Sequence, residues 1–256
     1  MATPKFQLTI DQSLNATSAT VRNKEGNVIT SSVKEYNRKD NTSDVSTGAY
    51  APRGIIDDMC DVVISVLGLN ECAPDAQANA TQTVTAAELS SVTFTHQPND
   101  VIVWDITDGL PICDALSDSD DYAKDIAKQL SQKCNITIEA DSVLARLSWI
   151  LTNIKDAHEK SEKGLLRYGN PSCWMLWNLS GGVNGLDNGE TKHVITTQDA
   201  QETGLYNVSH GTWDEELCNK AGIPLSILPT IAKPNENLAQ CRSDGIMPGV
   251  PIVDTH

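Results

Sequence analysis

The sequence predicts an α/β domain in which helices pack against a sheet. Segments of alternating apolar and polar residues come first and predict strands, and predicted helices then alternate with further strands. Residues 54–69 carry apolar side chains along one helical face, which predicts a helix lying against that sheet. A chain of 256 residues is also long enough to bury a substantial core.

The first strands are predicted from their alternation and from one turn. Phe6–Asp11 alternates apolar and polar residues, and Ala19–Arg22 resumes the pattern. Val28–Tyr36 follows the turn sequence Glu-Gly-Asn at 25–27. We expect these three strands to pair antiparallel, with a polar loop over residues 37–52.

Capping residues and turn residues delimit the elements that follow. Residues 73–90 are rich in Ala, Thr and Gln and are predicted to be a linker with a short helix. Asn170-Pro171 predicts a helix start, and Gly181-Gly182 predicts its stop. The remaining predictions are strands over 92–95 and 101–106, a hairpin turn at 107–109, helices over 121–133 and 143–154, the second capped by Asp141 or Ser142, and an acidic helix over 213–221 ended by Gly222.

Charge narrows the classes of partner. Lys and Arg number 19 and Asp and Glu number 34, so the net charge is −15. A net negative charge of this size disfavours binding to nucleic acids and to anionic membranes, because such binding depends on neutralising phosphates. The first residues contain no apolar signal core, and no apolar run approaches the ~20 residues of a membrane span. We expect a cytoplasmic protein with no membrane span.

Cysteine and histidine spacing gives no sign of a metal site. The seven cysteines have no C-x-x-C spacing, and the five histidines are scattered. We therefore expect buried thiols and no bound metal. Trp149, Trp174 and Trp177 lie at helical spacings on apolar faces and are predicted to be core residues.

An ordered set of motifs in the second half resembles one known family. The segments are Leu147–Ile154, Tyr168–Gly182, Leu205–Asn207, Trp213–Leu217 and Gly222–Pro229. In order and spacing they resemble glycerol kinases of the carbohydrate-kinase family, the animal enzymes in particular. The resemblance implies an actin-like, ribonuclease-H-like ATPase fold. It also implies that residues 1–256 form the N-terminal domain, and that the second, nucleotide-binding domain of this family is absent.

The same resemblance implies an active site whose motifs are degenerate here. The phosphate hairpin of the family aligns with residues 11–16, where Asp11 and Gln12 match and Ser13 replaces a glycine. The glycerol-contacting motif aligns with residues 96–100, where Gln97 matches but Pro98 and Asn99 replace an arginine and a glutamate. A substrate-contacting tryptophan of the family aligns near Asp118. Asp11, Gln12 and Gln97 are thus implied to be vestigial binding residues.

The position that the resemblance assigns to the catalytic base is Thr196. A threonine hydroxyl has no useful basicity near neutral pH, so no catalytic residue is expected there. Asp199 is three residues further on, which is about 10 Å along an extended strand. We therefore do not expect it to replace the base.

These losses predict a catalytically inactive glycerol-kinase-like domain with a structural or protein-interaction role and no cofactor. A protein partner or self-association is expected, because the apolar face toward a missing domain needs cover. Two alternatives stay open. One is an active kinase fragment that transfers phosphate from ATP, with Mg²⁺, to glycerol or another polyol; the other is a regulatory subunit that assembles with a true kinase.

Overall fold

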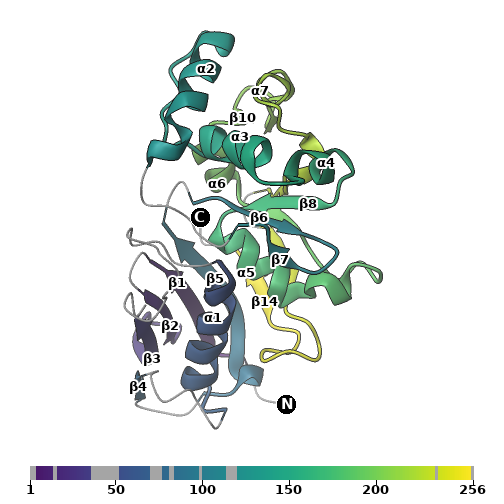
Figure 1. Cartoon of the computed structure of the whole chain (residues 1–256). Coiled ribbons are helices and arrows are strands. Elements are labelled where there is room, and N and C mark those ends of the chain that lie inside the picture. Colours follow the sequence, from purple (N-terminus) through teal and green to yellow (C-terminus); the bar gives the residue numbers. More distant parts are fainter. Residues whose placement is uncertain are drawn as a thin grey trace.

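The structure, a computed structural model, describes residues 4–13, 16–35, 52–69, 77–80, 84–97, 100–113, 120–233 and 236–254. Figure 1 shows a large sheet with helix α1 in the lower half of the molecule, and α2, α3, α4 and α7 gathered in the upper half. None of the helices in these residues is long and apolar enough to cross a membrane.

The large sheet is mixed, and its middle is parallel. Among the described residues its order is β13-β14-β5-β1-β2-β3-β4. Strand β5 lies between β1 and β14 and runs parallel to both, while the other neighbours are antiparallel. The bounds are β1 Phe6–Gln12, β2 Ala16–Arg22, β3 Val28–Glu35, β4 Gln77–Ala80, β5 Leu89–His96, β13 Asn237–Gln240 and β14 Pro251–Val253.

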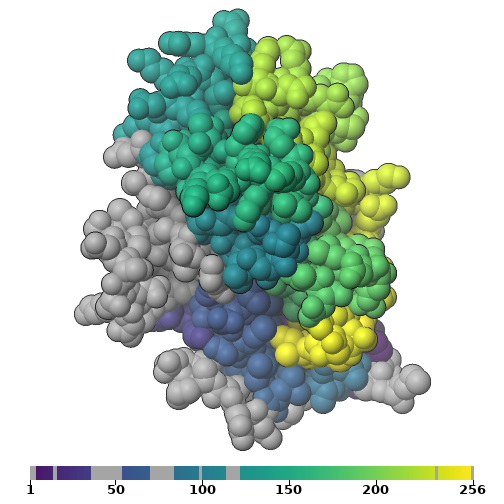
Figure 2. All heavy atoms as spheres, turned by 45° about the vertical axis from the view of Figure 1, so that its right-hand side comes forward, coloured from purple at the N-terminus to yellow at the C-terminus, as the bar shows by residue number. Residues whose placement is uncertain are grey.

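Two helices build the core against this sheet. Helix α1 (Pro52–Val66) packs on β2 and β3, and α5 (Pro171–Ser180) packs on β5 and β13. The apolar stripe of α1 and the tryptophans of α5 join the inward residues of β1 and β5 in one cluster. Figure 2 shows the C-terminal segment, in yellow, against the blue α1, although these residues are far apart in the sequence.

A second layer holds the rest of the chain. Its sheet has the order β7-β6-β8, with β6 Ile102–Asp105, β7 Leu110–Pro111 and β8 Leu166–Gly169. A second apolar cluster lies between this sheet and helices α3 and α7. The helices are α2 Lys124–Cys134, α3 Val143–Asn153, α4 Ala157–Glu162, α6 Thr197–Glu202 and α7 Glu215–Ala221.

Short elements complete the chain. Strand pairs are formed by β9 Val194–Ile195 with β12 Thr230–Ile231, and by β10 Tyr206–Asn207 with β11 Thr212–Trp213. The 3₁₀ turns are Ala86–Glu88, Asp120–Ala123, Gly182–Gly185 and Leu225–Ile227.

Most predicted elements are present, and the capping residues mark their ends. Asn170 caps α5 with Pro171 in its first turn, and Gly181 ends it. Ser142, rather than Asp141, caps α3 by accepting the backbone N–H of Ala145. Trp174 and Trp177 are buried, as predicted, and Trp149 is partly buried against Tyr122.

Two local predictions need correction. Residues 73–90 contain the predicted short helix, as the 3₁₀ turn Ala86–Glu88, but they also contain the strand β4, which has no apolar alternation and owes its conformation to pairing with β3. Trp213 belongs to β11 instead of the acidic helix, which begins at Glu215 after its cap Asp214.

Candidate functional site

A cavity among the described residues lies where the parallel strands end. Its volume is about 250 Å³, and its lining includes the last residues of β5 and β14 together with parts of α5 and α6. Because β5 and β14 are parallel, their carboxyl ends meet at one edge of the sheet. Open α/β sheets bind ligands at such edges.

The lining of the cavity combines apolar side chains with polar and acidic ones. Its apolar members include Phe94, Leu176 and Leu238. Its polar and acidic members include Thr95, His96, Thr196, Asp199, Glu202 and Asp254. No Lys or Arg is among the described residues that line it. This lining suits hydroxyl groups and disfavours an anion.

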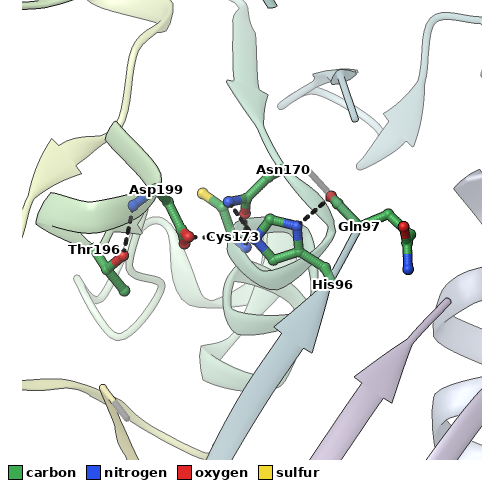
Figure 3. Close-up of polar contacts among 6 residues, drawn as sticks. All are labelled: His96, Gln97, Asn170, Cys173, Thr196 and Asp199. Carbon is green, nitrogen blue, oxygen red and sulfur yellow. Dashed lines mark hydrogen bonds and ion pairs between the residues drawn. The ribbon is translucent and has the colours of Figure 1, made fainter. Parts of the chain in front are cut away.

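Three side chains from separate elements meet beside the cavity, and two of them, His96 and Asp199, line it (Figure 3). His96 is the last residue of β5, Asn170 follows β8, and Asp199 lies in the first turn of α6. Asn170 Nδ2 is 2.8 Å from His96 Nε2, and Asp199 Oδ1 is 3.5 Å from the same nitrogen. His96 Nδ1 lies 2.7 Å from the backbone oxygen of Gln97. The side chains of His96 and Asp199 are 9% and 15% exposed, so the cluster is nearly withdrawn from solvent.

Burial and hydrogen bonding act in opposite directions on this cluster. Burial lowers the pKa of His96, but the hydrogen bond and negative charge of Asp199 raise it, so that the pKa lies above its ordinary value. Burial raises the pKa of Asp199, but the hydrogen bond and charge of a protonated His96, together with hydrogen bonds from Asn170 and Thr196, outweigh burial and lower it. Burial also raises the pKa of the neighbouring Cys173 thiol, so this lining residue stays protonated and uncharged.

Thr196 lines the cavity and has a structural role there. Its hydroxyl accepts the backbone N–H of Asp199 at 3.0 Å and so caps α6. The expected extended strand from Thr196 to Asp199 is wrong, because the chain turns into a helix at Thr197. One helical turn brings the Asp199 carboxylate into the same cavity as Thr196.

The other implied binding residues lie outside the cavity lining. Asp11, near the end of β1, accepts a hydrogen bond from the Thr95 hydroxyl. Gln12 is buried, and its side chain donates to the backbone oxygen of Ser13 at 2.8 Å. The Gln97 side chain points away from the cluster in Figure 3. Of the other aligned positions, Pro98, Asn99 and Asp118 fall outside the described residues.

The described residues of the hairpin after β1 offer little to a nucleotide phosphate or its metal. The Ser13 hydroxyl donates to the backbone oxygen of Ala16 at 3.0 Å, so it closes the hairpin instead of facing a ligand. Asp11 provides one carboxylate of the kind that holds a hydrated Mg²⁺. No group of three metal-ligating side chains occurs among the described residues. Asp11 is thus compatible with a magnesium ligand, but the Ser13 hydroxyl, which already donates to Ala16, does not fit a phosphate donor.

Sequence reasoning missed the cluster of His96, Asn170 and Asp199. The Asn-Pro pair does indicate that Asn170 caps a helix. A cap uses the side-chain oxygen, so the amide nitrogen of Asn170 remains available to another partner. The meeting of β5, β8 and α6 depends on tertiary packing, which no local pattern carries.

Sequence comparisons place the chain among carbohydrate kinases. The model of the FGGY family of carbohydrate kinases, N-terminal domain, matches residues 6–255. Glycerol kinase of Corynebacterium efficiens is 32% identical over 186 residues, which are 69% of this chain and 37% of that protein. Glycerol kinase of Nitratidesulfovibrio vulgaris is 27% identical over 259 residues, covering 97% of this chain and 47% of that protein. The chain thus spans less than half the length of these curated relatives.

Solved structures agree on the fold. The structure of Plasmodium falciparum glycerol kinase with ADP has a TM-score of 0.74 at 20% identity, with 99% of this chain and 48% of that chain covered. A ligand-bound xylulose kinase from Lactobacillus acidophilus has a TM-score of 0.71 at 18% identity, with 97% of this chain and 47% of that chain covered. The predicted actin-like kinase fold is confirmed, and the chain belongs to the FGGY family of carbohydrate kinases, whose N-terminal domain it matches.

Proposed function

We propose that this chain binds a small neutral polyol in the cavity at the ends of β5 and β14, as the acceptor-binding part of a glycerol-kinase-like carbohydrate kinase. The observation that carries the proposal is the lining of that cavity. Carboxylates and hydroxyls are part of the lining, and the described lining has no Lys or Arg to hold a phosphate or carboxylate ligand. Glycerol is the first candidate ligand, because several relatives are glycerol kinases.

Asp199 is the acceptor that we expect a ligand hydroxyl to use. Its carboxylate borders the cavity, and hydrogen bonds from its neighbours keep it ionised. A hydrogen bond to a charged group contributes about 1.5–3 kcal/mol, so Asp199→Asn should weaken glycerol binding about tenfold or more. Isothermal titration calorimetry with glycerol measures this.

Asp187→Asn is the matched control, since it removes an exposed carboxylate outside the cavity lining. It should leave glycerol affinity unchanged. Equal affinities of wild type and Asp199→Asn would contradict the role of Asp199. Absence of glycerol binding by the wild type in the millimolar range would contradict the polyol proposal itself.

A second candidate function is binding without phosphate transfer, in which the domain is a catalytically inactive structural or protein-interaction module. Two engaged hydroxyls favour it: Ser13 closes the β1–β2 hairpin, and Thr196 caps α6. ATP and Mg²⁺ would then have no role. Calorimetry with ATP·Mg²⁺ and a phosphate-transfer assay with glycerol distinguish the two candidates, because transfer by the purified chain would eliminate the inactive module.

The second candidate function also predicts that the chain binds a protein partner or associates with itself. Sedimentation of the purified chain, alone and mixed with a full-length glycerol kinase, tests self-association and assembly as a regulatory subunit. A monomer in both experiments would eliminate self-association and this regulatory role.

A further inference from the structure

The side chain of Asn170 makes a different contact at each end. Its Oδ1 accepts the backbone N–H of Cys173 at 2.8 Å and caps α5. A backbone N–H only donates, so this contact fixes which end of the amide is oxygen. The Nδ2 group therefore faces His96 Nε2, 2.8 Å away. Because an amide nitrogen only donates, Nε2 accepts and carries no proton in this arrangement.

The second ring nitrogen of His96 agrees with that assignment. Nδ1 is 2.7 Å from the backbone oxygen of Gln97, and a carbonyl oxygen only accepts. With Nε2 accepting from Asn170, Nδ1 therefore carries the proton and His96 is neutral; Figure 3 shows the contacts of both nitrogens. The orientation of the ring follows from Asn170 at one nitrogen and Gln97 at the other.

Asp199 provides a second partner for the same nitrogen. Its Oδ1 lies 3.5 Å from Nε2, and Asn170 also donates a hydrogen bond to Asp199. When Nε2 gains a proton from water, it donates to Asp199, and Asn170 Nδ2 keeps Asp199 as its own acceptor. Neither state leaves a buried donor without an acceptor, so neither state carries the cost of an unsatisfied buried group.

We infer that Asn170 is a positioning residue of the cavity, which holds neutral His96 by Nε2 and releases that nitrogen to Asp199 when His96 is protonated. The inference rests on the proposed function only in treating this cavity as the ligand site. The titratable groups that act on His96 are Asp199 from α6 and Asp100 after β5, and those that share the cavity lining with it are Glu202 from α6, Cys173 from α5 and Asp254 after β14.

The test compares substitutions that separate the cap from the histidine contact. Asn170→Ser keeps an N-cap oxygen but has no amide to reach His96. Removing a donor that competes with the Nε2 proton should shift the pKa of His96 upward. Asp199→Asn removes the negative partner and should shift it downward. A residue that only caps α5 would leave the pKa of His96 unchanged in Asn170→Ser.

The measurement is a pH series of long-range ¹H–¹⁵N spectra of the histidine rings, with His96 assigned from a His96→Gln variant. Before protonation, wild type should show a protonated Nδ1 and an accepting Nε2. An unchanged titration in Asn170→Ser would overturn the inference. If that variant does not fold, a wild-type spectrum with the proton on Nε2 in neutral His96 overturns it instead. No ligand is needed, so a failure to bind glycerol leaves this result standing.

Discussion

His193 is an imidazole that the protein keeps neutral. Its ring lies edge-on to Trp104 with centroids 5.4 Å apart, and Nε2 donates to the backbone oxygen of Tyr168 at 2.7 Å. Burial, assisted by the nearby charge of Arg167, lowers the pKa of His193 to about 4, although the Tyr168 contact opposes the shift. The unfolded chain therefore binds a proton at His193 at a higher pH than the folded protein does.

This difference predicts that acid destabilises the fold before the carboxylates are fully protonated. Between pH 6.5 and about 4 the unfolded state holds the proton, so the free energy of unfolding falls as the pH falls. A lowering of the pKa from 6.5 to about 4 corresponds to a loss of about 3 kcal/mol. Urea unfolding of wild type and His193→Gln across this range measures the loss as a difference.

The variant comparison also removes the opposite effect of His96. Its raised pKa stabilises the folded state below pH 6.5, and that stabilisation is lost as the pH rises through the raised value. The contribution of His96 is present in both proteins, so it cancels in the difference between their free energies of unfolding. His158→Gln, at an exposed position, should follow the wild type. Parallel curves for wild type and His193→Gln would show that His193 is not held neutral.

At the scale of elements, the junction of β8 and α5 depends on the absence of a side chain at Gly169. A Cβ added at Gly169 would lie 2.7 Å from Cys173 Cβ and 3.2 Å from Trp104 Cη2. Gly169→Ala should therefore lower the free energy of unfolding by about 1–3 kcal/mol, as overpacking does. It should also disturb Asn170, the next residue.

Gly54 is the matched control for Gly169, because the surroundings are open. A Cβ there meets no atom within 4 Å, and the residue lies in α1. Gly54→Ala should stabilise the protein by about 0.5–1 kcal/mol through helix propensity. Urea unfolding of both variants checks the opposite signs, and equal signs would contradict the packing described at Gly169.

The same elements show what the sequence predicted and what it did not. Helix α5 was predicted at both ends, because Asn-Pro and Gly-Gly act locally. Helix α6 was not, and Asp199 was misplaced with it, because a six-residue helix carries little periodicity. The position of β14 beside β5 also has no local signal, since its neighbour is more than 150 residues away in the chain. The cavity needs both elements, so its composition became visible only in the structure.

At the scale of the molecule, the net charge of −15 makes the folded state repel itself. A folded chain of this length has a radius of gyration of about 18 Å. The Debye length is about 30 Å at 0.01 M salt and about 8 Å at 0.15 M. At low salt, charges therefore interact across the whole protein, and at higher salt only neighbours do.

Added NaCl should accordingly raise the urea midpoint of unfolding between these two concentrations. The sedimentation coefficient should be recorded in parallel, so that any self-association is separated from the effect on folding. A midpoint that falls with salt would mean that local ion pairs, such as Lys34 with Asp58, outweigh the long-range repulsion.

Strand β14 lies beside β5 in the sheet, but the ribosome synthesises it long after β5. About 155 residues separate His96 from Pro251, and a ribosome adds about 5–20 residues per second, so β5 waits about 8–30 s for this neighbour. During that interval one edge of β5 is unpaired and open to another nascent chain. Shortening the wait, or shielding the edge with a chaperone, should raise the yield of correctly folded protein in cells.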